Sequence, residues 1–156
     1  MSLIIRKSEK DEVGRIADLL QALNDHEGYD YRPDPSALED AWENFDTYVA
    51  ESDEILIGVL CGSETFVPHN GTSWYEIQSL FVKESFRRQG AGEKLIHHVI
   101  QDKHSEGMKA FIINVRQKNK LGNDFYKSLG MQDKPLDHHR YFLHPDHIDN
   151  FIKKTA

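Results

Sequence analysis

The sequence has a single cysteine, Cys61, among its 156 residues. One thiol cannot form an intramolecular disulfide, so other contacts must hold the fold, and a reducing compartment is indicated. No apolar run approaches the roughly 18 residues that a transmembrane helix needs; one of the longest spans only Ala110 to Ile113. The first five residues lack the charged region and the small-residue cleavage site of a signal peptide. We therefore expect a cytoplasmic protein with no membrane partner.

Basic charge is also scarce, because 19 Lys and Arg residues stand against 26 Asp and Glu residues, for a net charge of −7. Binding to the phosphate backbone of a nucleic acid needs a basic surface, so no nucleic-acid partner is predicted. Internal repeats, low-complexity segments and proline-rich linkers are absent from the sequence. A chain of this length and composition indicates a single domain over residues 1–156.

The nine histidines invite a metal-site interpretation, which their spacing does not support. His97 and His98 are adjacent, and neighbouring positions on a helix point in different directions. No cysteine or carboxylate spacing completes a known ligand set around them. We expect no metal.

The hydrophobic pattern predicts a mixed α/β fold. Three strands with turns at 52–53 and 69–71 are typical of an antiparallel meander, and a strand, helix and strand then follow as a parallel βαβ unit. The expected strands are Leu3–Arg6, Thr47–Ala50, Ile55–Cys61, Trp74–Val82, Ala110–Val115 and Arg140–Leu143, and the expected helices carry Val13 to Leu23, Ser36 to Asn44, Leu95 to Ile100 and Asn119 to Leu129.

A glycine-bearing turn, Arg87-x-x-Gly90-x-Gly92, lies between a strand and a helix. Backbone N–H groups at such a helix start form an anion site, and glycine lets a phosphate oxygen approach closely. The turn is not a P-loop, because Gly92 is followed by Glu93 instead of lysine. It is not a dinucleotide fingerprint either, because Leu95 stands where a third glycine is needed.

A second segment strengthens the phosphate-loop interpretation. It reads Asn119-x(5)-Phe125-Tyr126-x-x-Leu129-Gly130-Met131. With the glycine turn, it resembles the GNAT superfamily of acyl-CoA-dependent N-acetyltransferases, whose pyrophosphate loop is Gln/Arg-x-x-Gly-x-Gly/Ala. The resemblance covers essentially the full chain. It implies a central mixed sheet of six to seven strands flanked by helices, acetyl-CoA as cosubstrate, and a homodimer.

The resemblance also implies which residues meet the cofactor. The pyrophosphate would lie on the loop amides, and the pantetheine arm would lie along strand backbones that splay apart. Asn119 either hydrogen-bonds the arm or caps its helix, and the two arginines are either pyrophosphate ligands or solvated surface charges. The expected cofactor residues are Leu80, Phe81, Val82, Arg87, Arg88, Gln89, Gly90, Ala91, Gly92, Glu93, Asn114 and Asn119.

An amine with a lysine-like pKa of about 10.4 must lose a proton before it attacks, which costs about 4 to 5 kcal/mol at neutral pH. Glu76 and Gln78 are two apart on the strand before the loop, which predicts that both share a face with Leu80. Glu76 is the candidate general base, although family members often carry the carboxylate at the position of Gln78, and the alternative is an exposed strand carboxylate. The resemblance implies that Tyr126 either protonates the departing thiolate or orients the thioester; the alternative is a tyrosine that packs beside Phe125.

The segment between the first two helices is acidic: it carries Asp25, Glu27, Asp30 and Asp34, with Tyr29 and Tyr31 between them. Such a loop either attracts a cationic amine or is simply solvated. We expect a small acceptor such as a diamine, a polyamine or an aminoglycoside-like compound, whose amine attacks the thioester directly. The acceptor would be held by Asp25, Glu27, Tyr29 and Gln78. The alternatives are a non-catalytic acyl-CoA-binding or sensor module, and an acetyltransferase acting on protein lysines or N-termini.

Overall fold

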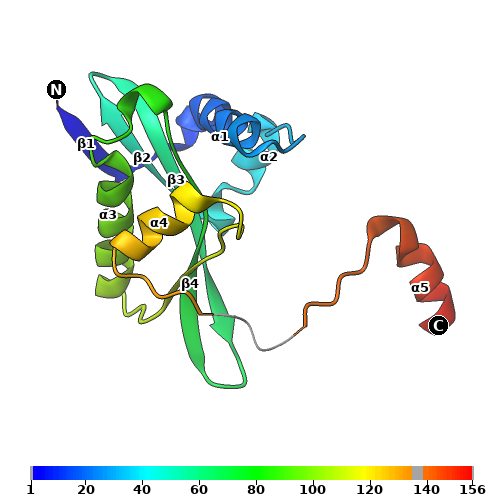
Figure 1. The fold of residues 1–156 in the computed structure, drawn as a ribbon. Coiled ribbons are helices and arrows are strands. Elements are labelled where there is room, and N and C mark those ends of the chain that lie inside the picture. The colour runs from blue at the N-terminus through cyan, green and yellow to red at the C-terminus, as the bar shows by residue number, and fades with distance from the viewer. Residues whose placement is uncertain (1, 135–138, 156) are drawn as a thin grey trace. The chain divides into compact units, whose positions relative to one another are not determined.

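The computed structural model describes residues 2–134 and 139–155 of the chain (Figure 1). The chain divides into two compact units, Met1–Arg116 and Gln117–Ala156, which are described separately. The single domain expected over residues 1–156 stays a prediction.

The first unit is built on a five-stranded sheet with the strand order β1-β2-β3-β4-β5. The first four strands pair antiparallel, and β5 pairs parallel with β4. The mixed α/β architecture, the meander and the βαβ unit are thereby confirmed, but the described residues form five strands where six or seven were expected. The strands are β1 (Leu3–Lys7), β2 (Asp46–Ser52), β3 (Ile55–Val67), β4 (Thr72–Val82) and β5 (Phe111–Ile113).

Helices cover both faces of this sheet, as Figure 1 shows. On one face, α1 (Val13–Glu27) packs Ile16 and Leu19 into a buried cluster with side chains of β2, β3 and β4. The short helix α2 (Pro35–Asp40) follows α1. On the other face lies α3 (Ala91–Ser105), which buries Leu95 and Val99. The helix expected over residues 36–44 is divided, because α2 ends at Asp40 and a separate 3-10 turn, η2, spans Trp42–Asn44.

A polar cluster joins the end of α3 to the sheet. The Lys103 ammonium, in a side chain only 9% exposed, lies 3.0 Å from the Asp46 carboxylate of β2. Tyr75 of β4 donates its hydroxyl to the same carboxylate at 3.1 Å, and Tyr48 of β2 donates to Asp102 of α3. Burial opposes the charge of Lys103, but the Asp46 partner outweighs it and raises the pKa of the ammonium. The buried ammonium of Lys103 is therefore paired with the carboxylate of Asp46.

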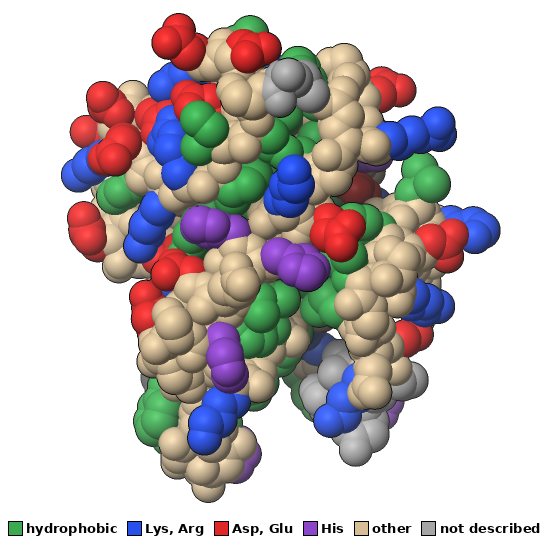
Figure 2. All heavy atoms as spheres, turned by 90° about the vertical axis from the view of Figure 1, so that its left-hand side faces the viewer, with side chains coloured by type: hydrophobic (Ala, Val, Ile, Leu, Met, Phe, Trp, Pro, Cys, Tyr) green, Lys and Arg blue, Asp and Glu red, His purple; other side chains and the backbone are tan. Residues whose placement is uncertain are grey.

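The surface is mixed in charge on the face of the molecule that Figure 2 shows. Acidic and basic side chains are interspersed there, and neither sign forms a continuous patch. Among the described helices, none is both long enough and apolar enough to cross a membrane.

The second unit contains α4 (Lys120–Ser128), the 3-10 turn η4 (Pro145–His147) and α5 (Ile148–Thr155). The strand expected over residues 140–143 was wrong: these residues are neither strand nor helix, and Tyr141 is 92% exposed. Their aromatic composition favours a strand, but a strand forms only where a neighbour accepts its ladder of hydrogen bonds.

A buried carboxylate anchors the start of the first unit. Glu12, which is 3% exposed, lies between β1 and α1 and accepts two hydrogen bonds of 2.8 Å from Arg6. It also accepts one from Arg15 at 3.0 Å and one from the backbone N–H of Glu9 at 2.8 Å. The guanidinium of Arg6 is the strongest influence and holds the pKa of Glu12 at about 2, against the opposing effect of burial.

Replacing Glu12 with Gln should therefore destabilise the protein by about 2 to 3 kcal/mol at pH 7, because the ionised carboxylate of Glu12 is held by Arg6 and Arg15 only in the folded state. A lowered pKa contributes stability above the unfolded value near 4.5, and this contribution disappears as the pH falls towards 2. Urea unfolding of the wild type and Glu12→Gln between pH 7 and 2.5 should show a difference that shrinks below pH 5. The exposed neighbour Asp11→Asn is the control, and a difference independent of pH would contradict the assignment.

Candidate active site

An irregularity in β4 organises the site. Cys61 and Gly62 are consecutive on β3 but pair with Ser79 and Ile77 of β4, so Gln78 is an extra residue without a register partner. Such a β-bulge reverses the alternation of a strand: beyond it, each side chain points to the face opposite the one that simple alternation predicts.

The reversal is visible in the contacts of β4. Tyr75, before the bulge, lies under Lys103 of α3, whereas Phe81, after the bulge, belongs to the cluster beneath α1. Leu80 therefore points to the α3 face, while Glu76 points to the α1 face. The prediction that Glu76 shares a face with Leu80 was wrong, because a pattern of period two cannot register an inserted residue. Gln78 is exposed and donates to the Ser63 hydroxyl at 3.3 Å.

The bulge coincides with the point where β4 and β5 part. Their parallel pairing runs only from Tyr75–Phe111 to Ile77–Ile113, although β4 continues to Val82. Lys83 donates its N–H to Ile57 of β3, so by alternation the backbone groups of Val82 and Leu80 face away from β3. Backbone donors and acceptors of β4 are therefore directed to an edge that β5 does not cover.

Glu76 stands beside this opening. Its carboxylate accepts a hydrogen bond of 3.2 Å from Asn114, the residue directly after β5. The candidate base is thus held from the neighbouring strand through Oε1, and its second oxygen, Oε2, is the atom that could receive a proton. Sequence reasoning had placed Asn114 at the cofactor and did not foresee this contact.

The glycine turn begins where β4 ends. Gly90 is the N-cap of α3 with φ of 80°, and Arg88 also has a positive φ, 67°, which is uncommon for a residue with a side chain. No side chain of the described residues caps the helix, so the N–H groups of Ala91, Gly92 and Glu93 have no partner that the helix itself supplies. The turn therefore leaves amide donors at the positive end of a helix dipole, and its role as an anion site stays a prediction. Gln89 is exposed within this turn.

Arg87 does not extend away from the protein. Its Nε donates to the Val82 carbonyl at 2.8 Å, and its guanidinium lies 5.4 Å from the centre of the Phe81 ring. The side chain therefore braces the turn against the end of β4. Arg88 is exposed, so of the two arginines it has the freer access to a ligand.

The segment after α1 lies at the same opening. His26, in the last turn of α1, has its ring 6.5 Å from that of Phe81. Tyr29 stacks on Tyr31 at 5.0 Å, and the guanidinium of Arg116 lies 4.1 Å from the centre of the Tyr29 ring. Arg116 was not a sequence-predicted site residue; the available signal was its position two residues after Asn114, which places both on one side of an extended chain.

The carboxylates of this segment have local partners. Asp25 accepts from Gln21 at 2.9 Å, and Asp30 lies 3.8 Å from Arg32. Asp34 caps α2 by accepting from the backbone N–H of Ser36. Part of the negative charge of this segment is therefore already hydrogen-bonded or paired with neighbouring residues. The roles of Asp25, Glu27 and Tyr29 in substrate binding stay predictions.

Two expected site residues belong to the second unit. Asn119 accepts from the backbone N–H of Gly122 at 3.0 Å and so caps α4; a contact with a cofactor stays a prediction. Tyr126 lies on α4 with its ring 5.1 Å from that of Phe125, which agrees with the packing alternative without testing an acid role.

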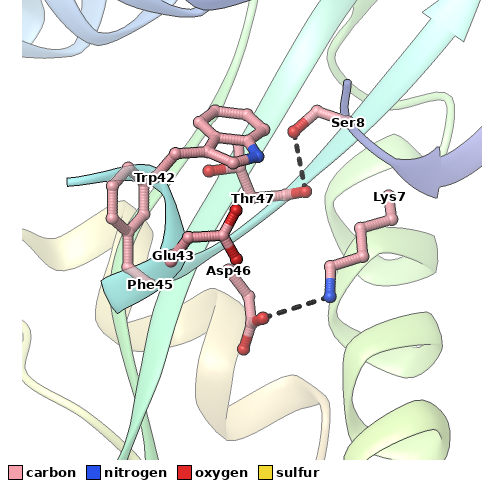
Figure 3. Close-up of a pocket in the computed structure, with 7 residues that line it drawn as sticks. All are labelled: Lys7, Ser8, Trp42, Glu43, Phe45, Asp46 and Thr47. Atoms are coloured by element: carbon pink, nitrogen blue, oxygen red, sulfur yellow. Dashed lines mark hydrogen bonds and ion pairs between the residues drawn. The ribbon is translucent and has the colours of Figure 1, made fainter. Parts of the chain in front are cut away.

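A separate small cavity of about 110 Å³ lies at the start of β2 (Figure 3). Its lining includes Lys7, Trp42, Glu43 and Asp46, and Lys7 pairs with Asp46 at 3.3 Å. No lining residue comes from β4, β5 or the glycine turn. In the described part of the chain, no three histidine, cysteine or acidic side chains come together as a metal site would require.

Comparisons with known proteins agree with this geometry. A model of the acetyltransferase (GNAT) family matches residues 16–131. An aminoglycoside acetyltransferase from an uncultured soil metagenomic sample, solved with trehalose, is similar in structure: TM-score 0.79, 21% identity, covering 91% of this chain and 97% of that chain. AAC(6')-Iy, solved with the bisubstrate analogue CoA-S-monomethyl-acetylneamine, has a TM-score of 0.75 and 20% identity over 92% of this chain and 100% of that chain.

A ribosomal-protein-alanine N-acetyltransferase from Brucella melitensis biovar Abortus 2308 is similar as well, with a TM-score of 0.73 and 16% identity over 92% of this chain and 99% of that chain. At such identities the likeness shows the fold. No curated protein matches the sequence.

The positive φ of Gly90 predicts that substitution with alanine has opposite effects on stability at Gly90 and at Gly14. An added Cβ would meet nothing within 4 Å at Gly90 or at Gly14, which lies in the first turn of α1 without a positive φ. Gly90→Ala should cost about 1 kcal/mol, because alanine adopts a left-handed conformation poorly. Gly14→Ala should instead stabilise by up to about 1 kcal/mol through helix propensity. Urea unfolding of both variants checks the opposite signs, and equal effects would contradict the described turn.

Proposed function

The chain belongs to the acetyltransferase (GNAT) family, and on that premise we propose that it transfers the acetyl group of acetyl-CoA to a primary amine of a small cationic acceptor. The observation that carries the proposal is the opening between β4 and β5 beyond Ile77 and Ile113. A carboxylate, Glu76, stands on one side of this opening, and the anion-binding turn follows at the end of the same strand.

The residues present suit the cosubstrate. Amides at the start of α3 that no side chain of the described residues caps are a fitting cradle for a pyrophosphate, and the positive φ of Arg88 and Gly90 directs them outwards. Arg88 would add charge-assisted hydrogen bonds. The backbone edge at Leu80 and Val82 would pair with the amides of a pantetheine arm. Acetyl-CoA, when bound, supplies the acetyl group as a reactive thioester.

The chemistry assigned to the chain is acid–base catalysis. Glu76 would accept the ammonium proton of the acceptor, directly or through a water molecule, and so produce the amine that attacks the acetyl carbonyl. The new C–N bond replaces the C–S bond without a covalent enzyme intermediate. Tyr126 would donate its proton to the departing thiolate, and the phenol would be restored by the second proton that the nitrogen loses as it becomes an amide. Cys61 does not take part: it is buried, and burial raises the pKa of its thiol to about 11.

The acceptor class rests on two supports. The first is the acidic segment from Asp25 to Asp34, which favours a cation even though it is partly matched by its own neighbours. The second is that solved structures similar to this chain include aminoglycoside acetyltransferases. Polyamines, diamines and aminoglycosides therefore rank first.

Calorimetric titration with acetyl-CoA and with CoA, followed by a thiol-release assay on an amine panel, tests the proposed function. We expect micromolar binding and release with a cationic acceptor from the panel of diamines, polyamines, aminoglycosides and, as an anionic comparison, aminophosphonates. Binding without release on amines or peptide N-termini would favour the sensor alternative. Release on peptides alone would favour a protein acetyltransferase.

Tyr126→Phe should lower kcat by about 100-fold or more while leaving acetyl-CoA affinity unchanged, because it removes only the phenolic hydroxyl that donates the proton. The neighbouring ring provides a matched control: Phe125→Leu alters the same helix without removing a proton donor. Steady-state kinetics with the best acceptor of the panel measure kcat for both variants. An unchanged kcat in Tyr126→Phe would contradict the role of Tyr126 as an acid.

A further inference from the structure

We propose that Arg116 and Tyr29 form a clasp that holds the segment after α1 across the opening between β4 and β5, which makes Arg116 a positioning residue for the acceptor amine. This inference rests on the proposed function for its kinetic consequence, but not for the contact itself. The contact joins residues 87 positions apart in sequence, at 4.1 Å between the guanidinium carbon and the ring centre of Tyr29.

The first step of the argument is where Arg116 comes from. The parallel ladder ends at Ile113, and the chain leaves the sheet through Asn114, Val115 and Arg116. Asn114 turns to Glu76, and Arg116, two residues on, reaches Tyr29. One short stretch of backbone therefore contacts both the candidate base and the segment after α1.

The second step is how the segment itself is built. Gly28, with φ of 76°, ends α1, and the N–H of Tyr29 returns to the Asn24 carbonyl at 2.9 Å. Tyr29 stacks on Tyr31 with an angle of 23° between the rings. The ring of Tyr29 therefore stacks on Tyr31 and also lies against the guanidinium of Arg116, so these three side chains form one stack.

The third step is what the stack does to the site. The ring of His26, three residues before Tyr29, approaches Phe81 at the end of β4. The segment after α1 is thus fixed on one side to β4 and on the other, through Arg116, to the exit of β5. These two attachments set the width of the opening on the face of the sheet from which Glu76 projects, so releasing one of them should weaken acceptor binding without removing the base.

Four variants separate the clasp from general effects of charge and volume. Arg116→Met removes the cation and keeps most of the side-chain length, whereas Arg116→Lys keeps a cation. Tyr29→Leu removes the aromatic face, whereas Tyr29→Phe keeps it. The matched control is Lys109→Met, because Lys109 is an exposed cation just before β5.

Loss of a partly exposed cation–π contact should raise the acceptor KM about fivefold. We expect this increase in Arg116→Met and in Tyr29→Leu, a smaller one in Arg116→Lys, and none in Lys109→Met. The kcat and the acetyl-CoA KM should stay within about twofold of wild type. The double variant Arg116→Met/Tyr29→Leu should resemble either single variant, since both remove one contact. Additive effects, or an equal KM increase in Lys109→Met, would overturn the proposal.

Hydrogen exchange supplies a readout that needs no activity. Backbone amides of residues 29–34 should exchange faster in Arg116→Met and Tyr29→Leu than in wild type, Tyr29→Phe or Lys109→Met. If no amine is acetylated, the proposed function fails, and the exchange result alone decides whether the clasp exists. Unchanged exchange in both disrupting variants would overturn the clasp, even if the enzyme is active.

Discussion

The extra residue in β4, Gln78, is the constraint on which the rest of the site depends. Because it adds one residue opposite the step from Cys61 to Gly62, it reverses which side chains and which backbone groups face each side beyond that point. Glu76 keeps its place on the α1 face, while the backbone of Leu80 and Val82 turns to the edge that β5 has left. The same irregularity thus provides both the carboxylate and the edge that β5 leaves uncovered.

Helix α3 is fixed to the sheet near both of its ends. Near its C-terminus, Asp102 and Lys103 are bound to Tyr48 and Asp46 of the sheet. Its N-terminus carries no side-chain cap among the described residues and is aligned instead by Arg87, which is bound to the end of β4. The helix dipole is therefore held in a fixed direction, with its positive end directed to the turn that we assign to a pyrophosphate.

Most elements of the first unit could be predicted because their signals are local. Apolar spacing in α1 and α3 and the runs of β-branched, aromatic and aliphatic residues in β2 and β3 each depend on a few neighbouring residues. The strand expected at Arg140–Leu143 failed for the opposite reason: its composition is that of a strand, but composition cannot supply a pairing partner. The shared face of Glu76 and Leu80 failed because a bulge is decided by the pairing of two strands, and one strand alone does not reveal it.

The sequence by itself determined the class of the fold, the glycine turn at Arg87–Gly92 between a strand and a helix, and the carboxylate of Glu76 as a candidate base, since each follows from residue types at short spacing. Only the tertiary structure decided that Arg87 braces β4, that Asn114 holds Glu76, and that Arg116 lies over Tyr29. Those contacts join residues distant in the chain, and their partners are selected by how strands and loops come together in space. No local pattern encodes that choice.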